Sequence, residues 1–214
     1  MAWLKLQYFC HVGESEIGGF AVTAADDPLY IERFETVLQG ATAASVEFSD
    51  GAVADFFDRC VDEGLTLQRF ARVWCHTHPG ESPDPSAIDE ATLDRVFGPC
   101  DWSVMFILSR TGKTFARLTF GAGPGGSMLI PVFVDWNRWP GDLAANPQRL
   151  ADHVQAWRSE YDANVHVRAF SSIASRLGER WGDELDVLGA ETADAEEFQA
   201  YFEAMEELRG EVMP

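Results

Sequence analysis

Two histidines separated by one residue, His76 and His78, directly follow residues 69–75, whose aromatic and β-branched content predicts a strand. Side chains alternate between the faces of a strand, so both imidazoles should point to the same side of a sheet. Asp89 follows in a segment that predicts the first turn of a helix. Two neutral nitrogens and one carboxylate, with a position left for water, form the donor set of a catalytic zinc site. The pattern therefore predicts zinc bound by His76, His78 and Asp89.

The segment between the histidines and Asp89 contains Pro79, Pro83 and Pro85, which lower the entropy cost of holding the ligands together. Ser86 and Asp89 also fit a capping box, in which the serine caps a helix and the acid lies at its third position. A cap and a metal ligand are compatible, because the cap would fix the direction of Asp89. A His-x-His pair alone also suits a polar strand edge. The full spacing His-x-His-x7-Ser-x2-Asp is expected by chance in about 5 × 10⁻⁴ of chains of this composition, which favours the metal site.

This spacing resembles the signature of the JAMM (JAB/MPN+) metalloprotease family, and the resemblance covers about residues 3–135. Members of the family also carry a glutamate two residues before a Gly-Gly or Gly-small pair that begins a strand. Glu16 precedes Gly18 and Gly19 in this way, whereas the competing Glu14 lies in the preceding turn. The resemblance implies that His76, His78 and Asp89 are zinc ligands. It also implies that Glu16 is the general base and that Ser86 is the hydrogen-bond donor on the oxyanion side.

Relatives in this family cleave bonds that follow the C-terminal glycine of ubiquitin or ubiquitin-like proteins. The resemblance thus implies an isopeptidase or peptidase with one Zn²⁺ per chain, which deconjugates or processes a ubiquitin-like protein through a zinc-bound water activated by Glu16. Two alternatives stay open: a hydrolase that releases a small-molecule conjugate, such as cysteine, from a ubiquitin-fold sulfur carrier, and a non-catalytic MPN scaffold. The complete residue set argues against the scaffold. A loop near the last strand clamps the substrate tail in the family, and residues 121–127 are the candidate here.

The chain of 214 residues has 16 basic and 35 acidic residues, a net charge of −19. Nucleic-acid binding is not expected, because it needs clustered Lys and Arg. No window approaches the ~20 apolar residues that span a bilayer, and the N-terminus lacks signal-peptide features. The cysteines are widely spaced and are expected to be reduced, mostly buried thiols of a cytoplasmic protein; they are Cys10, Cys60, Cys75 and Cys100. Cys75 should face away from the histidines and has no metal role.

The resemblance implies an α/β (α+β) fold of the cytidine-deaminase-like MPN/JAB type, with a mixed curved β-sheet flanked by helices. Hydrophobic patterns predict strands at 3–12, 17–23, 29–38, 45–48, 102–108, 114–120 and 128–134, besides the one before His76. The 3.6-residue period predicts a helix at 52–61, and a second helix is expected at 86–97. The first should bury Phe56, Phe57, Cys60 and Val61.

Two parts are expected: a catalytic domain at 1–138 and an acidic, helical C-terminal extension at 139–214. Residues 141–214 carry 16 acidic and 6 basic residues. Apolar stripes predict a helix after Asn146–Pro147 and two more, one around residues 173–185 and one around 194–208. Packing on the core, a homodimer through these helices and recruitment of a partner are all compatible with the pattern.

Overall fold

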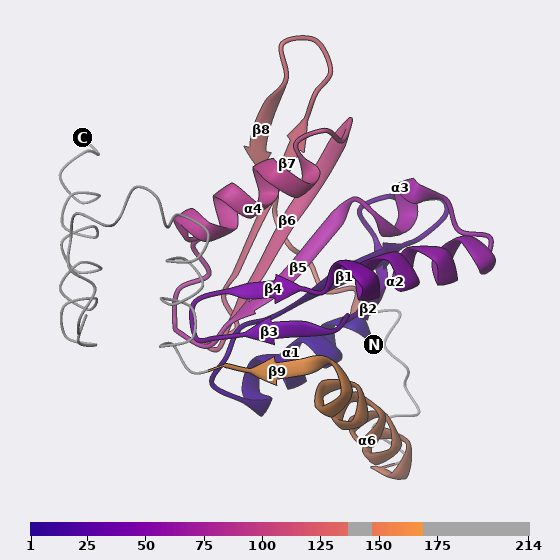
Figure 1. Ribbon diagram of the computed structural model, residues 1–214, viewed down its shortest axis with the longest axis vertical. Coiled ribbons are helices and arrows are strands. Elements are labelled where there is room, and N and C mark those ends of the chain that lie inside the picture. The colour runs from indigo at the N-terminus through magenta and orange to yellow at the C-terminus, as the bar shows by residue number, and fades with distance from the viewer. Residues whose placement is uncertain (137–146, 169–214) are drawn as a thin grey trace, which may run out of the picture. The chain divides into compact units, whose positions relative to one another are not determined.

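The computed structural model describes residues 1–136 and 147–168 (Figure 1). Its helices are α1 (Ala2–Val12), α2 (Asp50–Asp62), α3 (Leu67–Phe70), α4 (Ala87–Phe97) and α6 (Pro147–Asn164). Its strands are β1 (Ile17–Thr23), β2 (Ile31–Glu35), β3 (Gln39–Ala41), β4 (Val46–Phe48), β5 (Val73–His78), β6 (Trp102–Ser109), β7 (Thr114–Phe120), β8 (Gly126–Leu129) and β9 (Val165–Val167). The architecture is mixed α/β, as predicted.

The larger sheet has six strands in the order β2-β1-β5-β6-β7-β8. Strands β5 and β6 run parallel, and the other neighbours run antiparallel. A smaller sheet has the order β4-β3-β9, with β9 parallel to β3. The histidine strand β5 is therefore central, paired on both sides, and all six of its residues are buried.

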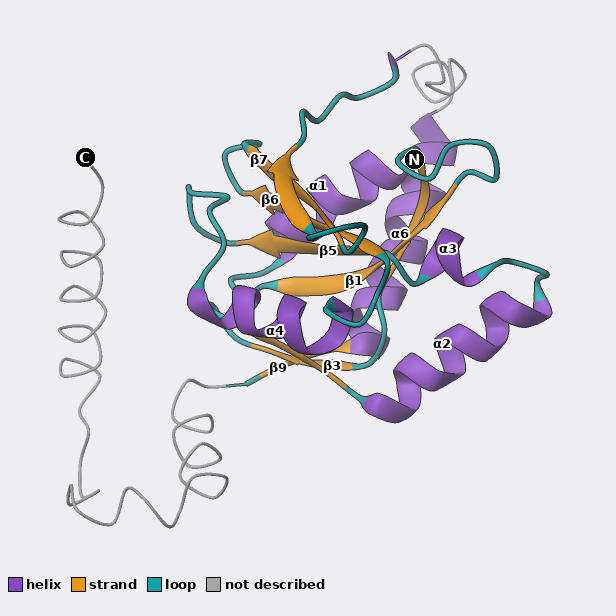
Figure 2. Cartoon of the chain, turned by 90° about the horizontal axis from the view of Figure 1, so that it is seen from above, coloured by secondary structure: helices purple, strands orange, loops and turns teal. Residues whose placement is uncertain are grey.

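The larger sheet separates two hydrophobic clusters, one on each face. Figure 2 shows the helices that cover the two faces. Along β5, Val73 and Cys75 join the cluster beneath α1, whereas Trp74 joins the cluster with α2, α3 and α4. Alternation then directs His76 and His78 toward the α4 face. Cys75 faces away from them, as predicted, and all four cysteines are free thiols.

The predicted strand at residues 3–12 is wrong, because these residues form helix α1. Aromatic residues in this segment are also compatible with a strand. However, the buried residues recur with the i, i+3, i+4 spacing of a helix; they are Ala2, Lys5, Leu6, Phe9 and Cys10. Helix α1 thus supplies one cover of the sheet, and β1 is the first strand.

Several other boundaries differ from the predictions. Strand β5 begins at Val73 rather than at 69, since α3 takes residues 67–70. The predicted strand at 29–38 is shorter, and the one at 128–134 is observed as β8, which ends before Pro131. Val61 is 57% exposed, so it is not part of the α2 core, while Phe56 and Cys60 are buried as predicted.

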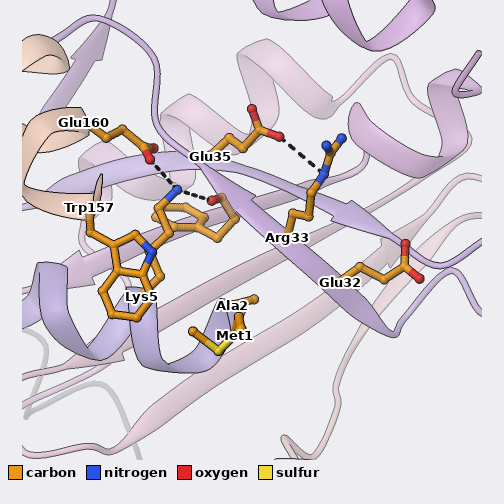
Figure 3. Close-up of a pocket in the computed structure, with 9 residues that line it drawn as sticks. Met1, Ala2, Lys5, Glu32, Arg33, Glu35, Trp157 and Glu160 are labelled. Atoms are coloured by element: carbon orange, nitrogen blue, oxygen red, sulfur yellow. Dashed lines mark hydrogen bonds and ion pairs between the residues drawn. The ribbon is translucent and has the colours of Figure 1, made fainter. Parts of the chain in front are cut away.

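Helix α6 packs against α1, and both helices belong to one compact unit that also includes β9. The domain boundary at 138/139 stays a prediction. The ring centroids of Tyr8 and Trp157 are 5.8 Å apart. The ammonium of Lys5 is buried between Glu160, 2.5 Å from its Oε2, and the carbonyl oxygen of Phe34, 2.6 Å away (Figure 3). A cavity of about 300 Å³ lies here; its lining includes Lys5, Glu160 and Trp157 but none of the predicted zinc-site residues.

Among the described residues, no helix has the length and hydropathy needed to cross a membrane. Three predictions lie outside the described residues: the cap at Asn146 and the helices around 173–185 and 194–208. The homodimer predicted through these helices is therefore not described either.

Candidate metal centre

The histidine pair is held by its strand position. His76 lies opposite Gly18 of β1 and Ile107 of β6, and His78 lies opposite Ser109 of β6. Because strands pair on both sides of β5, the two imidazole-bearing positions have little freedom to move. The Nε2 atoms of His76 and His78 are 3.2 Å apart.

Helix α4 positions Asp89 through the predicted capping box. The Ser86 hydroxyl accepts a hydrogen bond from the Asp89 N–H, and the Asp89 carboxylate accepts one from the Ser86 N–H. The buried face of α4 consists of Asp89, Leu93 and Phe97, at helical spacing of four. At the other end of this face, Phe97 stacks on Trp74. Both ends of α4 are therefore fixed against β5, and Asp89 is aimed at the histidines.

Glu16 directly precedes β1, on the same face as Gly18. Its backbone N–H donates to the carbonyl oxygen of Thr42 at 2.7 Å, and its side chain is buried. Glu14 is 89% exposed at its side chain and pairs with Arg110. The structure thus brings Glu16, and not Glu14, to the histidine pair.

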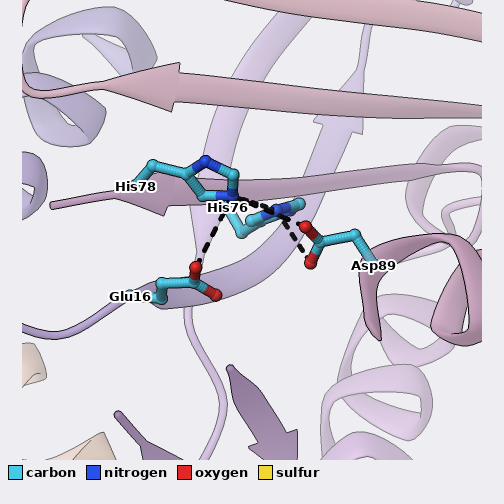
Figure 4. Close-up of side chains that lie close together, drawn as sticks. All are labelled: Glu16, His76, His78 and Asp89. Carbon is cyan, nitrogen blue, oxygen red and sulfur yellow. Dashed lines mark hydrogen bonds and ion pairs between the residues drawn. The ribbon is translucent and has the colours of Figure 1, made fainter. Parts of the chain in front are cut away.

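Four side chains meet at one buried point, although Glu16 lies 60 residues before the nearest of the others (Figure 4). His76 Nε2 lies 3.2 Å from Asp89 Oδ1, and His78 Nε2 lies 3.5 Å from Asp89 Oδ2. Glu16 Oε1 is 3.6 Å from His78 Nε2. One donor atom from each residue lies within 4.8 Å of the others, so the group could hold a metal ion.

The spacing fits a small divalent cation. In a tetrahedral site with metal–ligand distances near 2.0–2.2 Å, ligand atoms lie roughly 3.3–3.6 Å apart. The separations among the His76, His78 and Asp89 donor atoms are 3.2–3.5 Å. Two imidazole nitrogens and a carboxylate favour zinc or another transition metal over Mg²⁺ or Ca²⁺, which prefer oxygen donors.

The tautomer of His78 also suits a ligand. Its Nδ1 lies 3.1 Å from the carbonyl oxygen of Ser82. A carbonyl only accepts, so Nδ1–H donates; a histidine with its proton on Nδ1 can bind a metal ion through Nε2. For His76, Nδ1 is buried without a hydrogen-bond partner among the described residues, and Nε2 faces Asp89.

The two carboxyl groups have opposite electrostatic environments. Burial, with a smaller contribution from the charge of Asp89, raises the pKa of Glu16 to about 9. Burial alone would raise the pKa of Asp89, but hydrogen bonds with His76 and His78 outweigh it and hold that pKa well below its usual range. Burial lowers the pKa of His76, which favours the neutral ring that binds metals. Divergent pKa values in one cluster are typical of sites that transfer protons.

Three neighbours of the cluster were not predicted as parts of the site. Trp74 stacks on His76, with ring centroids 4.4 Å apart and planes 25° apart. Its position two residues before His76, on the same strand face, was a usable signal. The carbonyl groups of Ser82 and Thr42 orient His78 and Glu16 through contacts that sequence patterns do not encode.

The glycine pair has a packing role. A Cβ on Gly18 would lie 2.8 Å from the Phe48 ring, and a Cβ on Gly19 would lie 2.3 Å from the Glu35 carbonyl oxygen. Glycine at these positions allows β4 and β2 to approach β1 closely.

The segment at residues 121–127 lies far from the cluster. It joins β7 to β8 beside the N-terminal end of β6, where Trp102 pairs with Phe120. Ile107, the partner of His76, is five residues further along β6, roughly 17 Å at strand spacing. A substrate clamp beside the cluster would therefore need another segment.

Comparison with protein-family models finds no match, and comparison with curated proteins finds no match either.

Proposed function

We propose that this chain is a zinc-dependent isopeptidase or peptidase of the JAMM type that hydrolyses the bond after the C-terminal glycine of a ubiquitin-like protein. The observation that carries the proposal is the convergence of Glu16, His76, His78 and Asp89 at one buried point. The motif selects these residues by their spacing in the sequence, and the structure adds that their donor atoms lie within 4.8 Å of one another.

His76, His78 and Asp89 are proposed to hold the ion. Zinc bound there supplies a Lewis acid and lowers the pKa of a coordinated water from about 15.7 to about 7. The second carboxyl group, on Glu16, is then left for proton transfer.

Glu16 is proposed as the general base and acid. It accepts a proton from the attacking water as the water oxygen bonds to the carbonyl carbon, and it gives that proton to the amine as the C–N bond breaks. The positive charge of an ion nearby favours the carboxylate form of Glu16, which burial disfavours. Burial raises the pKa of Glu16 and a bound cation would lower it. The carboxyl group is therefore suited both to accept the proton from water and to give it to the amine.

Ser86 was expected to donate a hydrogen bond to the developing oxyanion. Its hydroxyl donates to Asp89 Oδ2 at 2.8 Å. A contact with substrate would therefore require the hydroxyl to rotate away from Asp89. We propose that orienting Asp89 is the main role of Ser86.

The finer fold assignment follows the same proposal. The mixed sheet, with α1 on one face and α2, α3 and α4 on the other, is proposed to be an MPN/JAB fold. The position of the cluster at the end of a central strand, opposite a capped helix, supports this assignment.

The proposal is tested by incubating the protein with fusions of ubiquitin-like proteins and mapping the cleavage position by mass spectrometry. Wild-type protein should cut after the terminal glycine, and a chelator should stop it. Glu16→Gln should bind zinc and lose activity by about 10²-fold or more. The matched control is Glu14→Gln, which changes an exposed carboxylate outside the cluster and should cut normally.

Full activity of Glu16→Gln, or cleavage that persists without metal, would contradict the proposal. Release of a small molecule from a ubiquitin-fold carrier, without cleavage of protein fusions, would replace the substrate assignment by the alternative hydrolase. Zinc uptake without any hydrolysis would favour the scaffold.

A further inference from the structure

Glu90, the residue after Asp89, is joined to the sheet by a two-bond ion pair. Arg117 of β7 donates through both terminal nitrogens, to Glu90 Oε1 at 2.9 Å and to Oε2. The Arg117 side chain is only 20% exposed, and its guanidinium lies over the Phe115 ring, 5.8 Å from the centroid. A planar pair of this kind fixes direction as well as distance, which a single exposed ion pair does not.

The guanidinium of Arg117 depends on this pair. Its Nε is buried and has no hydrogen-bond partner among the residues that the structure describes. Asp94, one turn further along α4, acts on Arg117 only through its charge. Loss of Glu90 would therefore remove the acceptor that the two terminal nitrogens share.

The pair is the second of two anchors that hold α4 on the sheet; the first is the stacking of Phe97 on Trp74. Trp74 pairs with Met105, and Met105 pairs with Arg117, so Trp74 and Arg117 lie in one row on the same face. They are two strand spacings apart, roughly 10 Å. Glu90 and Phe97 are seven residues apart, which is also roughly 10 Å along a helix. The anchor points on the helix thus match those on the sheet.

Asp89 lies at the end of α4 that the second anchor holds. Without this anchor, α4 could pivot on Phe97, which is roughly 12 Å from Asp89 along the helix. A pivot of about 1° would move Asp89 by about 0.2 Å, which is already the tolerance of a metal–ligand distance. The capping box does not oppose this motion, because Ser86 belongs to the same end of the helix.

We propose that Arg117 is a positioning residue for Asp89: through Glu90, it holds the first turn of α4 at the distance from His76 and His78 that a divalent ion requires. This inference deepens the proposed function and rests on the metal centre assigned there. The charge of Arg117 acts in the opposite direction, because a cation repels a divalent ion. Positioning and charge therefore predict opposite effects when Arg117 is replaced.

The first test is zinc affinity, measured by competition with a chelator. Arg117→Met keeps the apolar stem of the side chain and should weaken zinc binding by about tenfold, the low end for outer partners of a ligand. In the Glu90→Ala background, the same substitution should leave zinc affinity unchanged or raise it, because no pair remains to be broken. Arg117→Met should also alter the absorption spectrum of the Co²⁺-substituted protein.

Arg59→Met is the matched control. Arg59 also joins a helix to a strand, since it pairs with Glu35 of β2 at 2.5 Å, and it also lies over a phenylalanine ring, that of Phe56. Its helix is α2 rather than α4. The control should leave zinc affinity and the Co²⁺ spectrum unchanged.

A second measurement needs no metal. Hydrogen exchange in the metal-free chain reports on the first turn of α4, where the N–H groups of Asp89 and Glu90 donate to the hydroxyl and carbonyl oxygens of Ser86. Exchange of these amides should be at least about threefold faster in Arg117→Met. Arg59→Met should leave it unchanged.

The proposal is supported if Arg117→Met weakens zinc binding only when Glu90 is present and speeds exchange in α4. Equal or tighter zinc binding by Arg117→Met would overturn it, and so would the same loss with and without Glu90. Unchanged exchange in α4 would overturn it as well. A wild-type chain that takes up no zinc would contradict the proposed function itself, whereas these three results contradict only the role of Arg117.

Discussion

Ser86 donates two hydrogen bonds to one oxygen of Asp89: its N–H and its hydroxyl lie 2.7 and 2.8 Å from Oδ2. The other oxygen, Oδ1, faces His76. The carboxylate is thus oriented by the helix cap while one oxygen stays directed at the imidazole. In metal sites, partners of this kind set the direction and basicity of the ligand.

Ser86→Ala should lower zinc affinity by about 10- to 100-fold, because Asp89 loses the hydroxyl that orients it. The same change should cost about 1 kcal/mol of stability through the lost cap. Zinc affinity is measured by competition with a chromophoric chelator, and stability by urea unfolding. Ser86→Thr should restore most of the affinity.

The matched control is Ser49→Ala, since Ser49 precedes α2 at the equivalent position without a side-chain capping bond. It should leave zinc affinity unchanged. Normal zinc binding by Ser86→Ala with a loss of hydrolysis would instead assign the hydroxyl to the substrate oxyanion.

Glu16 should make the metal-free protein less stable as pH rises. Its folded pKa is raised to about 9, while an unfolded glutamate titrates near 4.5, so the folded state binds the extra proton between these values. Stability is then lost with rising pH, by up to about 1.4 kcal/mol per pH unit. Asp89 does not contribute between pH 7 and 9, because it is deprotonated in both states. His76 contributes a small opposite slope near pH 7, where the unfolded histidine is still partly protonated, and almost none at pH 8 and 9.

The measurement is urea unfolding of chelator-treated protein at pH 7, 8 and 9. Wild-type stability should decline over this range, and Glu16→Gln should show a flatter profile because it has no proton to lose. Identical pH profiles for the two proteins would refute the raised pKa of Glu16.

Trp74 should act as a positioning residue for His76. Trp74→Leu removes the ring that stacks on the His76 imidazole and on Phe97 of α4. The orientation of the His76 ring and the packing of α4 on β5 should therefore both become less well defined. We expect about tenfold weaker zinc binding and a changed absorption spectrum of the Co²⁺-substituted protein. Trp74→Phe should rescue both.

Trp102→Leu provides the comparison, because Trp102 packs against the α1 cluster on the opposite face. It should lower stability without altering the Co²⁺ spectrum. If both leucine variants changed the spectrum equally, the effect of Trp74 would be one of general stability.

Much of the candidate metal centre could be predicted from the sequence, because the signals for His76, His78 and Asp89 are local. The two-residue period of a strand places His76 and His78 on one face, and the capping box aims Asp89. Helix α1 is harder to predict, because its aromatic residues also suit a strand although Leu6, Phe9 and Cys10 have helical spacing. The packing of Phe48 on Gly18 depends on a contact between distant strands, which no local pattern reveals.

Lys5 should anchor α6 to the rest of the protein. Lys5→Met leaves Glu160 without its buried cation, at a cost of about 2 kcal/mol, reduced from that of a fully buried pair because Glu160 is partly exposed. Glu160 keeps its bonds from the N–H and hydroxyl of Thr36. Urea unfolding should show the loss, with zinc content unchanged. A variant with reduced zinc content would show that the α6 contact also supports the metal centre.

The central claim is that one divalent ion is bound by His76, His78 and Asp89 with Glu16 beside it. The most direct measurement is anomalous diffraction at the zinc edge from crystals of the zinc-loaded protein. We predict one peak per chain, about 2.0–2.2 Å from both Nε2 atoms and an Asp89 oxygen. A zinc-loaded crystal with no peak at this cluster, or with its peak bound by other residues, would contradict the account.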